Sequence, residues 1–171
     1  VRALFTTLRI ESGRSMFVEG AATGTGLEAL KSAARHGCAV TGMVSSEDRA
    51  AVVRLNGARG AINRRDPAVA ACFTMVPGDA EGIAAWEAQG EALLAQFRAQ
   101  HGGRLADYVV SHAGELAFPR SFQLLEQGGA LTFYGASSGY HFTFAGKAGA
   151  ETPTAMLRRA GTRAGEAVLI Y

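Results

Sequence analysis

The distribution of apolar residues along the chain predicts strands that alternate with helices. Short apolar runs suit buried strands, and the stretches between them repeat apolar side chains every three or four residues, as amphipathic helices do. Strands are expected at 16–18, 39–44, 59–63, 107–110, 129–134 and 167–171. Helices are expected at 2–10, 27–36, 45–55, 79–100, 117–127 and 154–160. Such alternation implies right-handed crossovers between parallel strands, so the predicted fold class is α/β with a doubly wound parallel sheet.

A glycine-rich turn lies where the first strand meets its helix. The apolar run at 16–18 is followed by glycines in the spacing G-x-x-x-G-x-G rather than the plain G-x-G-x-x-G. Glycines at such a turn let the backbone approach a pyrophosphate, whose charge is met by free N–H groups at the helix N-terminus. The candidate pyrophosphate residues are Gly20, Ala22, Thr23, Gly24, Thr25 and Gly26. The segment predicts a Rossmann-type dinucleotide-binding domain with six strands in the order 3-2-1-4-5-6, and a turn that serves only helix–strand packing is the alternative.

Residues just beyond the second and third strands bear on which dinucleotide binds. An NAD-specific domain places Asp or Glu about 20 residues past the glycines to bind the ribose 2′-hydroxyl, and here that interval ends at Ser46. Ser45 and Ser46, with Arg49 one turn later and Arg64 after the third strand, favour the 2′-phosphate of NADP(H). The acidic pair that follows Ser46 argues for NAD(H). Helix capping by the serines and solvated arginines are the structural alternatives.

The loops after the fourth and fifth strands are expected to pass near the nicotinamide ring. In a sheet of this order the ligand lies across the carboxyl ends of strands one and four. The candidate residues there are His112, Ala113, Gly135, Ala136 and Ser137. His112 can offer its side chain, contribute only its backbone, or be a structural histidine. No catalytic residue is assigned, and the two cysteines make no metal-ligand spacing with a histidine, so no metal site is predicted.

Composition agrees with one folded domain and removes several classes of function. The chain has 171 residues, of which 48% are hydrophobic and 19% charged. A net charge of +2 is too small to indicate nucleic acid or a membrane surface as partner, and no apolar run approaches the ~20 residues that span a bilayer. Cys38 and Cys72 lie in apolar surroundings, so we expect buried reduced thiols and a cytoplasmic location.

Both ends of the chain fall within predicted elements, the helix at 2–10 and the strand at 167–171. We therefore expect residues 1–171 to be one dinucleotide-binding domain of a longer protein. The last strand lies at an edge of the predicted sheet, where pairing with a second copy would give a homodimer.

The order of segments resembles the medium-chain dehydrogenase/reductase superfamily, specifically its zinc-independent quinone and enoyl-CoA reductases. The segments that carry this resemblance are 16–26, 44–50, 61–64, 118–129 and 134–139. Segments 111–114 and 138–141 look most like the crotonyl-CoA carboxylase/reductase branch, including the reductase module of propionyl-CoA synthases. Carboxylating members carry a histidine three residues after the glycine of the last motif, where this chain has Phe142 with His141 one step earlier, so the sequence leaves carboxylation open.

This resemblance implies a cofactor, a reaction and a missing domain. In the family a serine and a basic residue at the end of the second strand hold the 2′-phosphate of NADPH. Hydride then passes to an enoyl-CoA-type substrate, in a pocket formed largely with a separate N-terminal barrel domain. That barrel is absent from this sequence, so the isolated chain is expected to bind cofactor and turn over little.

Two other interpretations of the sequence remain. A short-chain dehydrogenase/reductase also fits the glycine spacing but needs a Tyr-x-x-x-Lys pair. The positions four after Tyr108 and Tyr134 are His112 and Ser138, and the position four after Tyr140 is a phenylalanine. None of these is lysine, so the sequence has no such pair. A non-catalytic domain that senses a nucleotide or scaffolds a partner is the second interpretation, because fold does not fix function.

Overall fold

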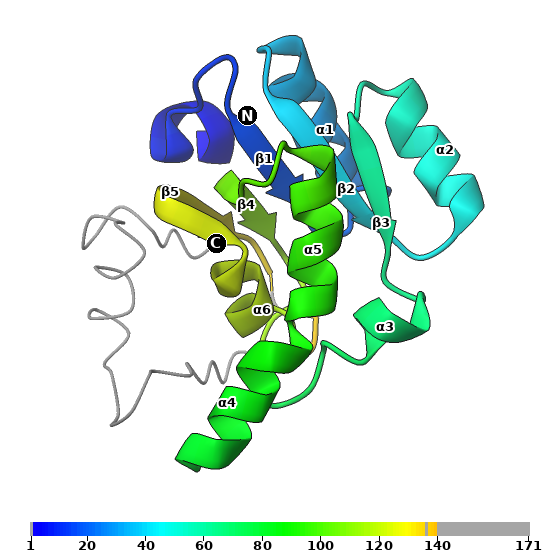
Figure 1. Ribbon diagram of the computed structural model, residues 1–171. Helices are drawn as coiled ribbons and strands as arrows, with labels where there is room; N and C mark the ends of the chain where they lie inside the picture. The colour runs from blue at the N-terminus through cyan, green and yellow to red at the C-terminus, as the bar shows by residue number, and fades with distance from the viewer. Residues whose placement is uncertain (1, 136, 140–171) are drawn as a thin grey trace.

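A parallel β-sheet forms the centre of the computed structural model, which describes residues 2–135 and 137–139 (Figure 1). The described sheet has five strands in the order β3-β2-β1-β4-β5. The strands are β1 (Ser15–Val18), β2 (Ala39–Val44), β3 (Gly60–Asn63), β4 (Ala106–Ser111) and β5 (Leu125–Phe133). All four neighbouring pairs are parallel, which confirms the α/β class and the predicted order for these strands. The predicted sixth strand at 167–171 and the helix at 154–160 lie outside the described residues.

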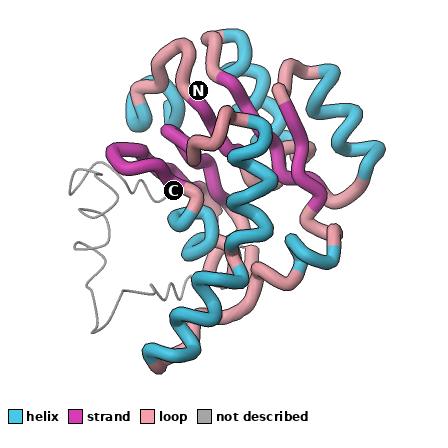
Figure 2. The backbone as a smooth tube through the Cα atoms, viewed as in Figure 1, coloured by secondary structure: helices cyan, strands magenta, loops and turns pink. Residues whose placement is uncertain are grey.

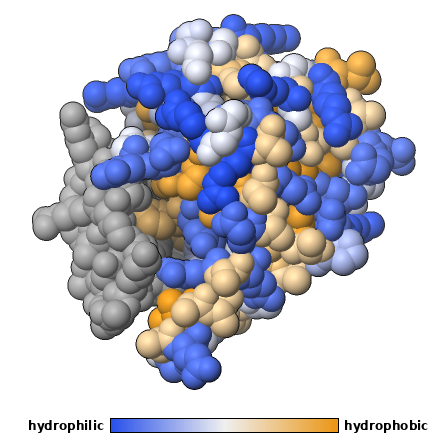
Figure 3. Space-filling model, viewed as in Figure 1, coloured by the Kyte–Doolittle hydropathy of each residue, from blue (hydrophilic) through white to orange (hydrophobic). Residues whose placement is uncertain are grey.

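Helices cover both faces of this sheet (Figures 1 and 2). They are the π-helix η1 (Ala3–Leu8) and the α-helices α1 (Gly24–Arg35), α2 (Glu47–Leu55), α3 (Pro67–Ala70), α4 (Ala80–Gln89), α5 (Glu91–Gln100) and α6 (Phe118–Gln123). No helix in the described part is long and apolar enough to cross a membrane. Hydrophilic side chains cover much of the outer surface in the view of Figure 3, with apolar ones between them.

Two apolar cores, one on each face, hold the helices to the sheet. Side chains alternate between faces along a strand, so Phe17 points to one side while Met16 and Val18 point to the other. Phe17 packs edge-on against Phe97 of α5, with ring centroids 6.1 Å apart. Met16 and Val18 belong to a second core with Leu30 of α1. Both cysteines are buried and free, as expected.

The predicted helices at 79–100 and 117–127 have clearly different bounds in the structure. The expected helix at 79–100 is two helices separated at Gly90, where the buried guanidinium of Arg120 fills the space beside the backbone. A Cβ on Gly90 would lie 2.1 Å from Nη1 of Arg120. The expected helix at 117–127 ends at Gln123, because Leu125 already pairs with Ala106 in the sheet.

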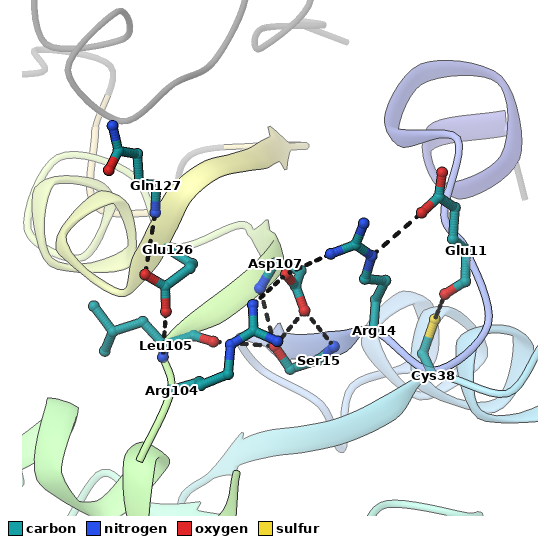
Figure 4. A network of polar contacts seen from close by, with 9 residues as sticks. All are labelled: Glu11, Arg14, Ser15, Cys38, Arg104, Leu105, Asp107, Glu126 and Gln127. Atoms are coloured by element: carbon teal, nitrogen blue, oxygen red, sulfur yellow. Dashed lines mark hydrogen bonds and ion pairs between the residues drawn. The ribbon is translucent and has the colours of Figure 1, made fainter. Parts of the chain in front are cut away.

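A buried carboxylate fastens β1 to β4 at the amino edge of the sheet (Figure 4). Oδ2 of Asp107 accepts hydrogen bonds from the backbone N–H and the hydroxyl of Ser15, at 2.8 and 2.9 Å. Its Oδ1 pairs with Arg104 at 3.2 Å and Arg14 at 3.4 Å. This network lies at the edge opposite the carboxyl ends of the strands and fixes the register of the two central strands there.

Candidate cofactor-binding site

A groove follows the carboxyl edge of the sheet, where the ends of the parallel strands meet. It consists of three cavities of about 210, 520 and 490 Å³ that share lining residues, and Ser137 lines all of them. The central cavity of about 210 Å³ lies between the glycine turn, the end of β2 and the segment after β4. This is the position that the strand order predicts for a ligand.

The central cavity brings together most of the residues predicted from sequence. It is lined by Gly20, Ala22, Thr23, Ser45, Arg49, Arg64, His112, Ala113 and Ser137. Gly24, Thr25 and Gly135 line the neighbouring cavity of about 520 Å³. Gly26 and Ser46 line none of the three cavities, and Ala136 lies outside the described residues.

Two glycines of the turn, Gly24 and Gly26, lie in the first turn of α1 rather than before it. Thr23 caps the helix, since its hydroxyl donates to the Gly20 carbonyl at 2.8 Å and accepts from the Gly26 N–H at 3.2 Å. Gly26 serves packing, because a Cβ there would lie 2.2 Å from the Gly20 carbonyl oxygen. Gly24 faces open space, with no atom within 4 Å of a built Cβ. The first N–H groups of a helix lack intrahelical partners, so Gly24 and Thr25 present theirs at the groove.

Serine and arginine side chains from two separate segments of the chain meet in the central cavity. Ser45 and Arg49 come from the start of α2, and Arg64 follows β3. The backbone N–H of Arg64 donates to the Val44 carbonyl at 2.8 Å, which holds the end of β3 beside the end of β2. Ser46 caps α2, as its hydroxyl accepts from the Arg49 N–H at 3.4 Å. The capping alternative therefore describes Ser46, whereas Ser45 faces the cavity.

The acidic pair at 47–48 lines none of these three cavities. The carboxylate of Glu47 instead accepts a hydrogen bond from the side chain of Asn63 at 3.5 Å. The argument for NAD(H) from this pair has no geometric support in the described residues.

Glu19 is a residue of the groove that sequence reasoning missed. Its side chain is only 2% exposed, and it lines two of the three cavities. A single oxygen, Oε2, accepts hydrogen bonds from the Ser111 hydroxyl at 2.6 Å, the His112 N–H at 2.9 Å and the Ala113 N–H at 3.2 Å. A glutamate that directly follows an apolar strand and precedes the first glycine was the available signal.

Two polar atoms at the groove make no hydrogen bond to any described residue. They are Nε2 of His112 and the hydroxyl of Tyr134, and both are buried. The two rings lie 5.7 Å apart, and both residues line the cavity beside Thr23. Burial raises the pKa of the Tyr134 phenol, the Glu19 carboxylate raises it further, and the nearby Thr23 side chain partly opposes the rise.

Gly20 gives the groove its close approach between strand and loop. Its φ is +58°, and a Cβ on it would lie 1.7 Å from Nε2 of His112. The imidazole therefore rests directly on the glycine turn. Together, the orphaned polar atoms, the open Gly24 and the arginine-lined cavity fit a ligand that carries phosphates and hydroxyls. No group of three or more metal-ligating side chains occurs among the described residues.

Comparison with known proteins finds relatives of this chain among oxidoreductases. Among curated relatives, the crotonyl-CoA carboxylase/reductase of Cereibacter sphaeroides is 27% identical over 148 residues, which is 79% of this chain and 31% of that protein. The quinone oxidoreductase of Rattus norvegicus is 38% identical over 65 residues, which is 38% of this chain and 20% of that protein. The chain thus spans about a third or less of the length of these relatives.

Solved structures show the same fold. The crotonyl-CoA carboxylase/reductase AntE in complex with NADP matches with a TM-score of 0.84 and 23% identity, over 99% of this chain and 39% of that chain. The 2-octenoyl-CoA carboxylase reductase CinF, with NADP and 2-octenoyl-CoA bound, matches with a TM-score of 0.75 and 24% identity. The match to CinF covers 99% of this chain and 34% of that chain.

A family model described as zinc-binding dehydrogenase matches residues 24–156, which is more than half of the chain. This confirms the predicted resemblance and favours the medium-chain over the short-chain interpretation. The chain belongs to the zinc-binding dehydrogenase family, within the medium-chain dehydrogenases/reductases that its sequence resembles.

Proposed function

We propose that this chain is the NADP(H)-binding domain of an oxidoreductase. The observation that carries the proposal is the central cavity, in which Ser45, Arg49 and Arg64 face the glycine turn at the start of α1. Two guanidinium groups and a hydroxyl suit a 2′-phosphate, because arginine presents fixed, permanently charged donors. The solved relatives with NADP bound support the same choice of cofactor.

The proposed site divides the cofactor among three groups of residues. The pyrophosphate lies against Gly24 and Thr25 at the α1 N-terminus, where the helix dipole and the free N–H groups favour an anion. The 2′-phosphate lies between the serine and the two arginines. The nicotinamide end would lie toward His112, Ala113, Gly135 and Ser137. Bound NADPH supplies a hydride, and these residues orient the ring that carries it.

The activity proposed for the whole protein is reduction of the double bond of an enoyl-CoA-type substrate. The names of the relatives support this, since they are a crotonyl-CoA and a 2-octenoyl-CoA carboxylase/reductase. This chain spans 31% of the first of these, so positioning of the acyl substrate falls to segments beyond it. We therefore propose that the isolated domain binds cofactor with little turnover. A cytoplasmic location and pairing between copies stay predictions.

Calorimetric titration with NADPH and NADH at low and moderate salt tests the cofactor assignment. We expect NADPH to bind at least about tenfold more tightly, because a hydrogen bond between charged groups contributes ~1.5–3 kcal/mol. Arg49→Gln should remove most of that preference. Arg54→Gln is the matched control, since Arg54 is an exposed arginine in the last turn of α2 that lines none of the three cavities. Equal affinities for the two cofactors would refute the 2′-phosphate site. Binding of neither would favour a non-catalytic scaffold.

A further inference from the structure

We propose that Glu19 is a positioning residue for the cofactor site, because its carboxylate holds the segment 111–113 in the conformation that binding requires. The inference rests on the NADP(H) function proposed above and assigns a role to a residue outside the glycine turn and the phosphate-binding loops. In this role Glu19 acts through the backbone of His112 and Ala113 and performs no chemistry itself.

The hydrogen bonds to Glu19 compensate for the burial of its carboxylate. Removing a carboxylate from water is unfavourable unless donors replace the lost hydration. Three donors do so at one oxygen, one from the last residue of β4 and two from the segment that follows it. Among the described residues no arginine or lysine forms an ion pair with it. The carboxylate is therefore stabilised by the loop, and the loop is fixed by the carboxylate.

The segment held by Glu19 in turn positions the loop after β5. The Ala113 carbonyl accepts hydrogen bonds from the hydroxyls of Ser137 and Ser138, and from the Ser138 N–H at 2.7 Å. The His112 carbonyl accepts from the Ser137 N–H at 3.4 Å. A continuous path of hydrogen bonds thus runs from the end of β1, through 112–113, to the far wall of the groove. Loss of the first link loosens both loops that line the nicotinamide end.

Asp107 provides a matched comparison within the same two strands. It is 9% exposed and ties the start of β4 to the start of β1 through Ser15, as Glu19 ties the end of β1 to the end of β4. Asp107 borders the amino edge and lines none of the three groove cavities (Figure 4). A purely structural role predicts similar effects of neutralising either carboxylate. A positioning role predicts that only Glu19 affects cofactor affinity.

For a variant that neutralises Glu19, charge removal and loss of positioning predict opposite changes in the affinity for the cofactor. Replacing Glu19 with glutamine removes a negative charge beside a groove for a polyanionic ligand, which by itself strengthens anion binding. Positioning predicts weaker binding, because neutral acceptors hold the three donors less strongly and the loop must be ordered on binding. The direction of the change in affinity therefore distinguishes the two roles.

The experiment compares Glu19→Gln with Asp107→Asn in the full chain by thermal unfolding and by calorimetric titration with NADPH. We expect Glu19→Gln to bind about five- to tenfold more weakly, with the salt dependence of the wild type because the arginines are unchanged. The fluorescence of bound NADPH should move toward that of free NADPH. Asp107→Asn should lower the unfolding temperature and change affinity by less than about twofold.

Three results would overturn the inference. They are wild-type or tighter binding by Glu19→Gln, an equal loss by Asp107→Asn, and unchanged fluorescence of bound NADPH. If Glu19→Gln does not fold, Ser111→Ala removes only the 2.6 Å donor, and we expect about two- to threefold weaker binding. Unchanged affinity there overturns the inference as well. A wild-type chain that binds no NADPH refutes the proposed function itself, and this inference with it.

Discussion

Replacing Gly24 with aspartate should weaken cofactor binding about 30-fold without damaging the fold. Gly24 is the first residue of α1 and is exposed at the groove. A Cβ built on it meets no atom within 4 Å, so the side chain has room. Its backbone lies outside the left-handed region, so a residue other than glycine is not strained there. The position therefore accepts a carboxylate at the place where the pyrophosphate is proposed to lie.

The added carboxylate has opposite effects on the stability of the domain and on its affinity for the cofactor. An acid in the first turn interacts favourably with the helix dipole by about 0.3–1 kcal/mol, so the free energy of unfolding should stay the same or rise. A carboxylate about 4 Å from one phosphate charge is repelled by about 4 kcal/mol at an effective dielectric constant of about 20. Solvent and salt at an exposed site reduce this to about 2 kcal/mol, which weakens binding about 30-fold.

Calorimetry with NADPH and denaturant unfolding measure the two effects on the same protein. Gly24→Asn is the matched control, because asparagine has nearly the same size and no charge. We expect it to lose at most about threefold in affinity, and the loss in Gly24→Asp should shrink as salt rises. Wild-type affinity in Gly24→Asp would refute the placement of the pyrophosphate. An equal loss in Gly24→Asn would mean that space, rather than charge, limits binding.

Three further predictions concern stability. Gly26→Ala should cost about 2 kcal/mol in denaturant unfolding, because its Cβ would meet the Gly20 carbonyl; a wild-type midpoint would contradict this. Gly90→Ala should cost about 1–3 kcal/mol in the same assay, since the Arg120 guanidinium beside it is fully buried and stacked 3.5 Å over the Trp86 ring. Burial, aided by Arg59, lowers the pKa of His101 to about 4, so the unfolded chain takes up the proton first as pH falls below about 6.5. Stability should therefore drop by about 2 kcal/mol between about pH 7 and pH 5 in urea titrations, and His101→Gln should remove most of that slope.

The sheet was predictable because its strands carry a local signal. Most described strands contain a short apolar run, and the alternation of side chains along them divides the two cores. The exception is β5, which begins at Leu125 rather than at the predicted residue 129, because the residues that follow Leu125, 126–129, are polar or glycine and carry no apolar signal. The start of α1 was placed too late, at residue 27, because glycine has a low helix propensity. The structure begins this helix at Gly24, since the Thr23 cap and the contact of Gly26 with Gly20 outweigh that propensity. The short α3 was missed although Asp66 followed by proline is a helix start.

Other features depend on contacts that no local pattern contains. The contact at the junction of α4 and α5 is one example, because Arg120 lies on a different helix 30 residues beyond Gly90 and enters the space beside that glycine. Glu19 is paired with Ser111, which is 92 residues away in the sequence. Sequence reasoning found the loops of the groove from the strand order, but it had no means to find which side chain holds them together.

The groove therefore combines two kinds of residue with different tolerance to change. Ser45, Arg49 and Arg64 line the central cavity from positions that are partly or fully exposed, so one substitution can alter the preference for a 2′-phosphate while the fold stays intact. Glu19 is buried and accepts from three donors at once, so a replacement weakens or removes several hydrogen bonds together. We infer that cofactor preference and the geometry at the nicotinamide end change independently. A variant of this domain can lose the second while still binding the phosphates tightly.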